Sequence, residues 1–167
     1  MFRRFAAMAL MLALITANAG AMELYAGGDP VADFTLKLTD GTDFTLSACK
    51  GKAVVIDLWT TWCEGCVSYS LPALDALAAA YPDDVAVLAV NCGDAARDVE
   101  DFAAQSAYAF PMAADEELNI LYNWFPTTEI PYCVFIDRQG NFSAAIPGAD
   151  KNTAQTYADA LAALLGQ

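Results

Sequence analysis

The chain has 167 residues, 57% of them hydrophobic, which is enough for one sizeable core and favours a single domain. Its 21 Asp and Glu outnumber its 8 Lys and Arg, and the net charge of −13 argues against nucleic acid as a partner. An acidic surface keeps a protein soluble, and it would also steer this one toward basic proteins.

The N-terminal residues have the pattern of an export signal. The short basic region Phe2-Arg3-Arg4 precedes an apolar stretch from Ala6 to Ile15, and Ala17-Asn18-Ala19 offers small residues for cleavage. We predict a signal peptide over 1–19, a linker over 20–29 and a folded domain over 30–167. The apolar stretch is short for a membrane span, so an uncleaved N-terminal anchor is the alternative. The protein is expected to be exported, periplasmic or otherwise extracytoplasmic, where disulfides persist.

The first half of the domain predicts a hairpin, a buried strand and a long helix. Residues Asp33 to Leu38 and Thr42 to Leu46 alternate apolar and polar side chains around a turn at Asp40-Gly41. The apolar run Ala53 to Trp59 predicts a buried strand, and Glu64 to Ala80 predicts a helix.

The second half alternates strands and helices. Val85 to Val90 predicts a second buried strand, Asp94 could cap a helix to Gln105, and Asp115 could cap another over Glu116 to Trp124. The last predicted elements are strands over Tyr132 to Ile136 and Asn141 to Ile146 and a helix over Lys151 to Leu165. This order predicts an α/β fold, a mixed central sheet with helices on both faces.

The motif Trp62-Cys63-Glu64-Gly65-Cys66 lies between the first buried strand and the helix that follows it. A helix N-terminus stabilises a thiolate, so Cys63 is the candidate nucleophile and Cys66 its resolving partner. Zinc would need further ligands, and the chain has no histidine and no second CxxC pair. Haem attachment would need a histidine where Val67 stands. The alternative is two cysteines that only pack in a core.

Several segments in order resemble the extracytoplasmic thioredoxins of the TlpA/ResA type, from about Pro30 to the C-terminus. The matching pieces are Pro30 to Leu36, Leu46-Ser47 with Gly51-Lys52, Val55 to Trp59 leading to Trp62-Cys63, and Ile130-Pro131 with Phe135-Ile136-Asp137. The resemblance implies a thioredoxin fold with an N-terminal β-hairpin and an insertion after the second buried strand. It also implies that Pro131 is a cis-proline facing the dithiol.

A cis-proline exposes the backbone edge of the residue before it, so Ile130-Pro131 would dock a substrate strand beside Cys63. Pro126 competes for this role, because Phe125-Pro126-Thr127-Thr128 superficially copies a Pro-Thr-Thr motif common in the family. The distance from Pro131 to the end of the following strand at Asp137 favours Pro131 over Pro126. Trp62, Glu64 and Gly65 would border the same docking site.

Asp57 lies six residues before Cys63, where thioredoxins proper carry a buried acid. Burial would raise its pKa and make it an acceptor for the Cys66 proton. The alternative is that Asp57 only satisfies nearby backbone groups or a bound water.

Three features depart from the family pattern. A glutamate found shortly after the second cysteine in ResA-like members is absent from Val67 to Ser70. Pro72 follows Cys66 by six residues, one more than usual, which a helix bulge could absorb. The loop from Asn123 to Ile130 is longer than expected.

Three cysteines lie outside the motif. Cys49 and Cys133 are predicted to be small core residues. Cys92 ends a strand on the same sheet edge as the dithiol and is either buried or a reactive third thiol.

Together these features predict an exported thiol–disulfide oxidoreductase that reduces protein disulfides. Cys63, Cys66 and Asp57 would be catalytic, and no cofactor is implied. The expected partners are exported proteins that contain disulfides and a membrane dithiol electron donor, and we expect a monomer. A peroxiredoxin-like peroxide reductase, suggested by Thr60-Thr61-Trp62-Cys63, and a non-catalytic thioredoxin-fold binding module are the alternatives.

Overall fold

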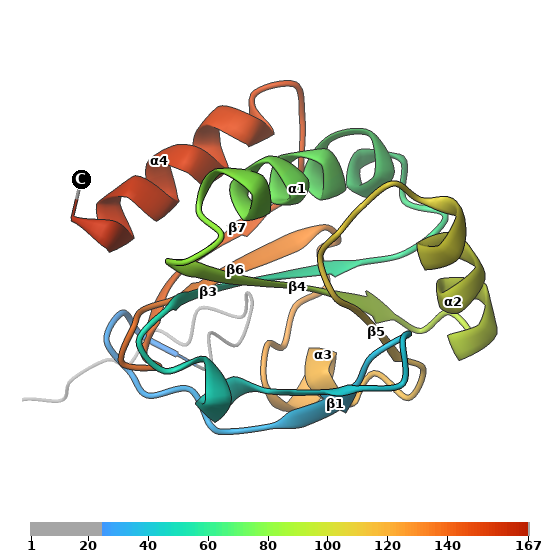
Figure 1. Ribbon diagram of the computed structural model, residues 1–167, viewed down its shortest axis with the longest axis horizontal. Coiled ribbons are helices and arrows are strands. Elements are labelled where there is room, and N and C mark those ends of the chain that lie inside the picture. The colour runs from blue at the N-terminus through green and yellow to red at the C-terminus, as the bar shows by residue number, and fades with distance from the viewer. Residues whose placement is uncertain (1–24, 167) are drawn as a thin grey trace, which may run out of the picture.

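The computed structural model describes residues 25–166, and its centre is a mixed five-stranded sheet in the order β5-β4-β3-β6-β7 (Figure 1). Strand β3 (Ala53–Trp59) lies in the middle, parallel to β4 (Val85–Cys92) and antiparallel to β6 (Tyr132–Ile136). The edges are β5 (Met112–Asp115), parallel to β4, and β7 (Phe142–Pro147), antiparallel to β6. Strand β3 is buried along its whole length, as expected of a strand covered on both faces.

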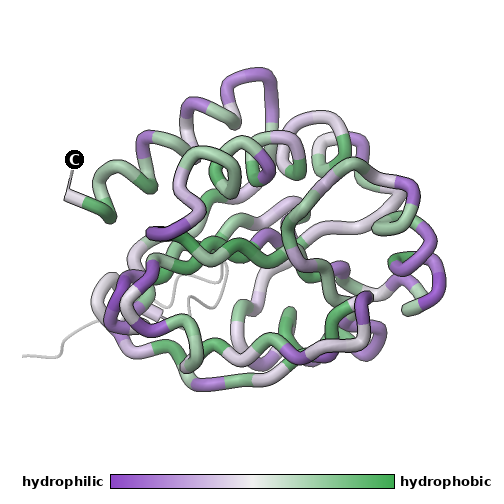
Figure 2. Tube along the Cα trace, in the orientation of Figure 1, coloured by the Kyte–Doolittle hydropathy of each residue, from purple (hydrophilic) through white to green (hydrophobic). Residues whose placement is uncertain are grey.

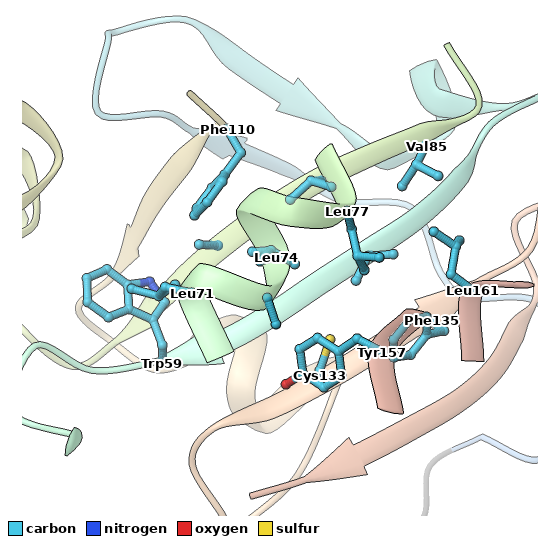
Figure 3. Packing of buried hydrophobic residues seen from close by; sticks show 14 of the residues in the cluster. Trp59, Leu71, Leu74, Leu77, Val85, Phe110, Cys133, Phe135, Tyr157 and Leu161 are labelled. Carbon is cyan, nitrogen blue, oxygen red and sulfur yellow. The ribbon is translucent and has the colours of Figure 1, made fainter. Parts of the chain in front are cut away.

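Helices α1 (Leu71–Ala80) and α4 (Thr153–Leu165) pack side by side on one face of the sheet. Figure 3 shows Leu71, Leu74 and Leu77 of α1 above the strands, with Tyr157 and Leu161 of α4 beside them. Fully burying one such leucine contributes roughly 1.5–3 kcal/mol. The strands carry much of the most hydrophobic sequence (Figure 2). Their buried side chains belong to two clusters, so the core lies on both sides of the sheet.

The other face is covered by a two-stranded hairpin and two short helices. The hairpin pairs β1 (Thr35–Lys37) with β2 (Asp43–Thr45), and the short helices are the 3₁₀-helix η1 (Leu46–Cys49) and α3 (Asn119–Asn123). Helix α2 (Ala96–Gln105) follows β4 and buries Val99 in the same cluster as α1 and α4. Between β4 and β6 the chain therefore carries α2, β5 and α3. The predicted hairpin and the predicted insertion after the second buried strand are confirmed.

The helix after the dithiol is continuous but not uniform. Residues Cys66–Ser70 form a π-helical turn, η2, in which the Leu71 N–H donates to the Cys66 carbonyl, and α1 follows with Pro72 in its first turn. A π-turn accommodates one additional residue within a helix. The bulge expected from the late position of Pro72 is thus confirmed.

Two predicted boundaries were wrong. Asp94 caps no helix, because its carboxylate accepts hydrogen bonds from the Thr61 N–H and the Asn91 amide, and α2 begins at Ala96. The helix expected over Glu116 to Trp124 is only Asn119–Asn123, although the Asp115 carboxylate does accept hydrogen bonds from N–H groups at its start. Strand β5 was not expected at all.

The predicted signal peptide and residues 20–24 of the predicted linker lie outside the described residues. Within residues 25–166, no helix is long and apolar enough to span a membrane.

Candidate active site

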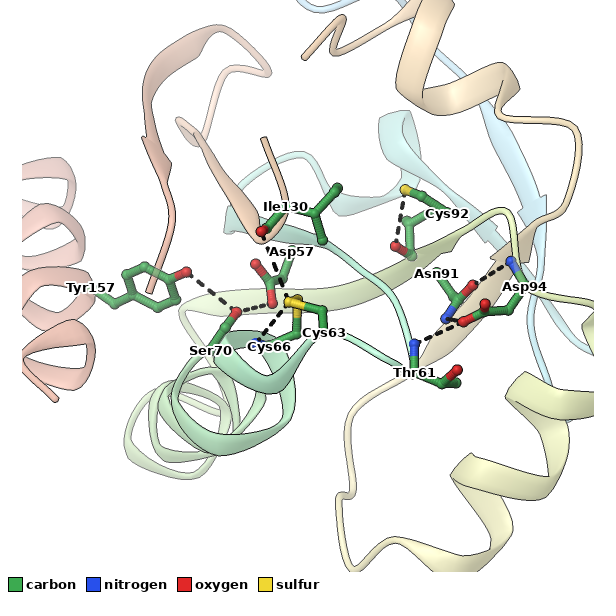
Figure 4. The surroundings of a disulfide bond; sticks show 11 residues. Asp57, Thr61, Cys63, Cys66, Ser70, Asn91, Cys92, Asp94, Ile130 and Tyr157 are labelled. Carbon is green, nitrogen blue, oxygen red and sulfur yellow. Dashed lines mark hydrogen bonds between the residues drawn. A yellow bond between two sulfur atoms is a disulfide. The ribbon is translucent and has the colours of Figure 1, made fainter. Parts of the chain in front are cut away.

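The dithiol lies where the chain leaves the carboxyl end of β3 and enters η2 (Figure 4). Asp94, from the loop after β4, holds this connection by accepting a hydrogen bond from the Thr61 N–H at 2.8 Å. Cys63 and Cys66 are joined in a disulfide, with their Cα atoms 5.2 Å apart. Neighbouring strand ends therefore fix the position of the CxxC loop.

The two cysteines differ in exposure and in surroundings. Cys63 is partly exposed, whereas Cys66 is fully buried. The Cys66 backbone N–H donates to the Cys63 sulfur at 3.1 Å, so an N–H of the first helical turn points at the more exposed sulfur. Such a donor stabilises negative charge on that sulfur once the disulfide is reduced. The arrangement suits Cys63 as the attacking thiol and Cys66 as the resolving one.

The loop before β6 approaches Cys63 from the other side. The Ile130-Pro131 peptide bond is cis, as the resemblance implied for Pro131 and not for Pro126. The Ile130 carbonyl oxygen lies 3.9 Å from the Cys63 sulfur. Gly65 lies nearby, where an added Cβ would be 3.8 Å from the Pro131 side chain. The motif and the proline loop thus meet around Cys63.

Asp57 lies behind the dithiol on β3 and is completely buried. The Ser70 hydroxyl donates to its Oδ2 atom, whereas Oδ1 has no hydrogen-bond partner among the described residues. Burial raises the pKa of Asp57 to about 7, and the hydroxyl groups of Ser70 and Tyr157 oppose part of that rise, Ser70 directly and Tyr157 through its contact with Ser70. A carboxyl group with this pKa is able to exchange a proton near neutral pH.

The outer surface of the motif is formed by two of its other side chains. Trp62 is 76% exposed, and Glu64 is also exposed. Within residues 25–166, no ion pair or hydrogen bond joins a lysine or arginine side chain to the motif; the three ion pairs are Lys37–Asp43, Arg97–Asp101 and Arg138–Asp84.

The three remaining cysteines are unpaired. Cys92 is buried, and that burial, together with the nearby Asp115 carboxylate, raises the pKa of its thiol to about 12, so it is not a reactive third thiol. Cys133 is fully buried, as expected, but it lies opposite Asp57 in the β3–β6 register. Cys49 is only half-buried at the end of η1, where a core position was expected.

Sequence reasoning did not single out Ser70 or recognise the polar role of Tyr157. Tyr157 lies within the helix predicted over Lys151 to Leu165, and Ser70 belongs to the stretch noted only for its missing glutamate. A hydroxyl four residues after Cys66 was the available signal, since such a residue faces the same side of a helix.

Comparison with known proteins agrees with this geometry. A profile of the Redoxin family matches residues 26–164. The chain belongs to the Redoxin family. The thiol-disulfide oxidoreductase ResA of Geobacillus thermodenitrificans is 32% identical over 122 residues, which cover 72% of this chain and 69% of that protein. The thioredoxin-like protein YneN of Bacillus subtilis is 37% identical over 109 residues, which cover 62% of this chain and 64% of YneN.

Solved structures show the same relationship. A candidate thiol:disulfide interchange protein DsbE from Chlorobium tepidum matches with a TM-score of 0.75 at 28% identity, over 85% of this chain and 99% of that one. This member of the Redoxin family has a thioredoxin fold and is a thiol–disulfide oxidoreductase of the ResA and DsbE type. The predicted TlpA/ResA resemblance is confirmed.

Proposed function

We propose that the protein is an exported reductase of protein disulfides that uses Cys63 to attack, Cys66 to resolve and Asp57 to accept a proton. The observation that carries this proposal is the asymmetry of the cysteine pair. Cys63 is accessible and lies 3.9 Å from the Ile130 carbonyl, whereas Cys66 is enclosed. Only Cys63 can meet the disulfide of a folded protein.

In the first step the Cys63 thiolate attacks one sulfur of the substrate disulfide. A mixed disulfide forms between Cys63 and the substrate, and the other substrate sulfur leaves as a thiolate. In the second step Cys66 gives its proton to Asp57 and attacks the Cys63 sulfur. The Cys63–Cys66 disulfide forms and the second substrate sulfur leaves, so two electrons have passed to the substrate.

The Ile130-Pro131 edge would hold an extended segment of the substrate next to Cys63. Trp62, Glu64 and Gly65 would form the rest of the rim, and the exposed Trp62 ring offers an apolar contact. The export signal predicted over residues 1–19 would place this chemistry outside the cytoplasm. There a membrane dithiol donor would reduce the Cys63–Cys66 disulfide after each turnover.

The reducing direction is supported by the charges near the dithiol. Strongly oxidising proteins of this kind stabilise the thiolate of the attacking cysteine, which makes their disulfide readier to accept electrons. Here Glu64 stands between the cysteines and the buried Asp57 lies behind them. We therefore expect only modest stabilisation of the Cys63 thiolate.

Trapping of mixed disulfides tests the assignment of roles. Full-length Cys66→Ser should accumulate covalent adducts with exported proteins, visible on non-reducing gels and absent after reduction, because its attacking thiol remains while the resolving thiol is gone. Cys63→Ser should accumulate few adducts. Cys49→Ser, which removes a half-buried thiol, is the matched control and should resemble the wild type. Equal trapping by Cys66→Ser and Cys63→Ser would contradict the assignment.

A further inference from the structure

A chain of three buried polar side chains from three different elements lies behind the dithiol. Asp57 is on β3, Ser70 ends the π-turn η2, and Tyr157 is on α4. Ser70 donates its hydroxyl proton to Asp57 Oδ2, and the Ser70 and Tyr157 hydroxyl oxygens are 3.4 Å apart (Figure 4). All three residues have no solvent exposure.

This chain of contacts orients the Asp57 carboxyl group. One oxygen is engaged by Ser70, while Oδ1 lacks a hydrogen-bond partner among residues 25–166. An unpartnered carboxylate oxygen in a buried site is costly, and a catalytic role is one reason for which native proteins retain such an atom. Oδ1 is therefore the oxygen that is free to receive a proton.

The unpaired thiols and the tyrosine hydroxyl around Asp57 are neutral near pH 7. Cys133 on β6 lies opposite Asp57 in the sheet and interacts with the Tyr157 hydroxyl, and burial raises the pKa of both groups. Cys92 on β4 is also buried, with its pKa raised to about 12. The third thiol is Cys66 itself, on η2, once the disulfide is reduced. No lysine or arginine contributes to the pKa of Asp57, so the hydroxyls alone stabilise its charged form.

We propose that Ser70 and Tyr157 are positioning residues that hold Asp57 ready to take the proton of Cys66. Ser70 fixes Oδ2, Tyr157 holds the Ser70 hydroxyl in place, and Oδ1 receives the proton as the Cys66 thiol becomes the attacking thiolate. The proposal rests on the role given to Asp57 in the proposed function. In this chain two hydroxyl groups, and not a nearby cation, would stabilise the charged form of Asp57.

Removing either hydroxyl should change the pH dependence of the resolving step. The hydrogen bond from Ser70 and the contact of Tyr157 with Ser70 both favour the charged carboxylate. Loss of either hydroxyl therefore raises the pKa of Asp57 from about 7. For Ser70→Ala the midpoint of the pH profile should move up by about one unit, which slows resolution at neutral pH about fivefold. Tyr157→Phe acts through Ser70 and should give a smaller shift. The alkaline plateau should stay at the wild-type rate.

The resolving step can be followed by rapid mixing of the reduced protein with dithiobis(nitrobenzoate), an aromatic disulfide that releases a coloured thiolate. Attack by Cys63 releases one coloured thiolate, and resolution by Cys66 releases a second. Excess reagent makes the first phase the faster one, so the second phase reports resolution. All variants carry Cys49→Ala, because Cys49 is the most exposed of the other thiols.

The matched controls remove equivalent groups from the surface. Ser68→Ala alters an exposed serine in the same π-turn, and Tyr122→Phe removes the hydroxyl of an exposed tyrosine. Each hydroxyl variant is also made in an Asp57→Asn background. The proposal expects shifted midpoints for Ser70→Ala and Tyr157→Phe, none for the controls, and no added effect in that background.

Three results would overturn the positioning role alone. The first is an unchanged midpoint for both hydroxyl variants while Asp57→Asn still slows resolution. The second is slowing by the hydroxyl variants that is equally large in the Asp57→Asn background. The third is a lowered plateau without a shift of the midpoint, as expected of a merely structural role. If Asp57→Asn leaves the second phase unchanged at every pH, the acceptor role in the proposed function fails as well.

Discussion

At the scale of single residues, burial makes the charged form of Asp57 unfavourable. The hydrogen bond that its carboxyl group accepts comes from the Ser70 hydroxyl and not from a cation. The folded protein therefore binds the Asp57 proton more tightly than the unfolded chain does. A group of this kind is retained at the expense of stability, which fits a role in proton transfer.

Asp57→Asn should consequently make stability depend less steeply on pH. Below the ordinary carboxyl pKa of 3.8 the group is protonated in both states, and between 3.8 and about 7 it is protonated only in the folded state. The folded protein thus loses stability as pH rises through this window, by about 4 kcal/mol at most. The asparagine side chain of the variant does not titrate, so the advantage of the variant should grow from about pH 4 to about pH 8.

Urea unfolding of the oxidised wild type and variant at both pH values measures this difference. Comparing the two proteins cancels the carboxyl groups whose pKa values are lowered by hydrogen bonds, such as Asp33 and Asp40. If the stability difference between the two proteins does not change with pH, the pKa of Asp57 is not raised in the folded protein.

The residues that the sequence identified are those with a distinctive local pattern. Cys63 and Cys66 are marked by their spacing, and Asp57 and Pro131 by the resemblance to thioredoxins, with the distance to the strand end favouring Pro131 over Pro126. Ser70 and Tyr157 are 87 positions apart, and no local pattern predicts that α4 brings the tyrosine onto the π-turn. Cys133 reaches Asp57 through strand pairing, which a single sequence does not specify.

At the scale of elements, two aspartates that looked alike in sequence act differently. Asp94 accepts the Thr61 N–H and secures the CxxC loop, whereas Asp115 accepts the N–H groups of Asn119, Ile120 and Leu121. The role of Asp94 depends on Thr61, which is 33 residues away in the sequence, whereas the role of Asp115 depends on residues that follow it closely. Strand β5 escaped prediction because its short sequence, Met-Ala-Ala-Asp, has no alternating pattern and gains its place by pairing with β4.

Asp115→Ala should destabilise the protein markedly. The substitution leaves three N–H groups at the start of the short helix α3 without their acceptor, and the site is buried. We expect a loss of about 2–3 kcal/mol of unfolding free energy, more than for a usual N-cap, because three N–H groups lose one buried acceptor. Glu117→Ala, at an exposed position two residues later, should cost less than about 0.5 kcal/mol.

Urea denaturation of both variants provides the measurement. Equal and small losses would mean that α3 does not depend on the Asp115 carboxylate.

At the scale of the whole molecule, the mixed sheet brings the parts of the site together. Strands β3 and β4 are parallel, so both have their carboxyl ends at the same end of the sheet, and the CxxC loop and Asp94 follow them there. Strand β6 is antiparallel to β3, so its beginning and the Ile130-Pro131 bond lie at that same end. Alternating strands and helices predicted this architecture and the position of Pro72 predicted the helix bulge, whereas the pairing order of the strands required the structure.

Net charge acts on the same scale. The chain carries −13, Glu64 lies within the motif, and the described ion pairs place no lysine or arginine beside the dithiol. An environment of this sign disfavours the thiolate of the reduced protein. The dithiol should therefore give up its electrons readily, as a reductase requires.

The reduction potential of the Cys63–Cys66 pair tests the claim of a reductase most directly. The protein with Cys49→Ala would be equilibrated with mixtures of reduced and oxidised glutathione, and the fraction of disulfide measured after acid quenching and thiol labelling. We predict a midpoint nearer that of thioredoxin, about −270 mV, than that of DsbA, about −120 mV. A midpoint above about −160 mV would contradict the account and identify the protein as an oxidant or isomerase.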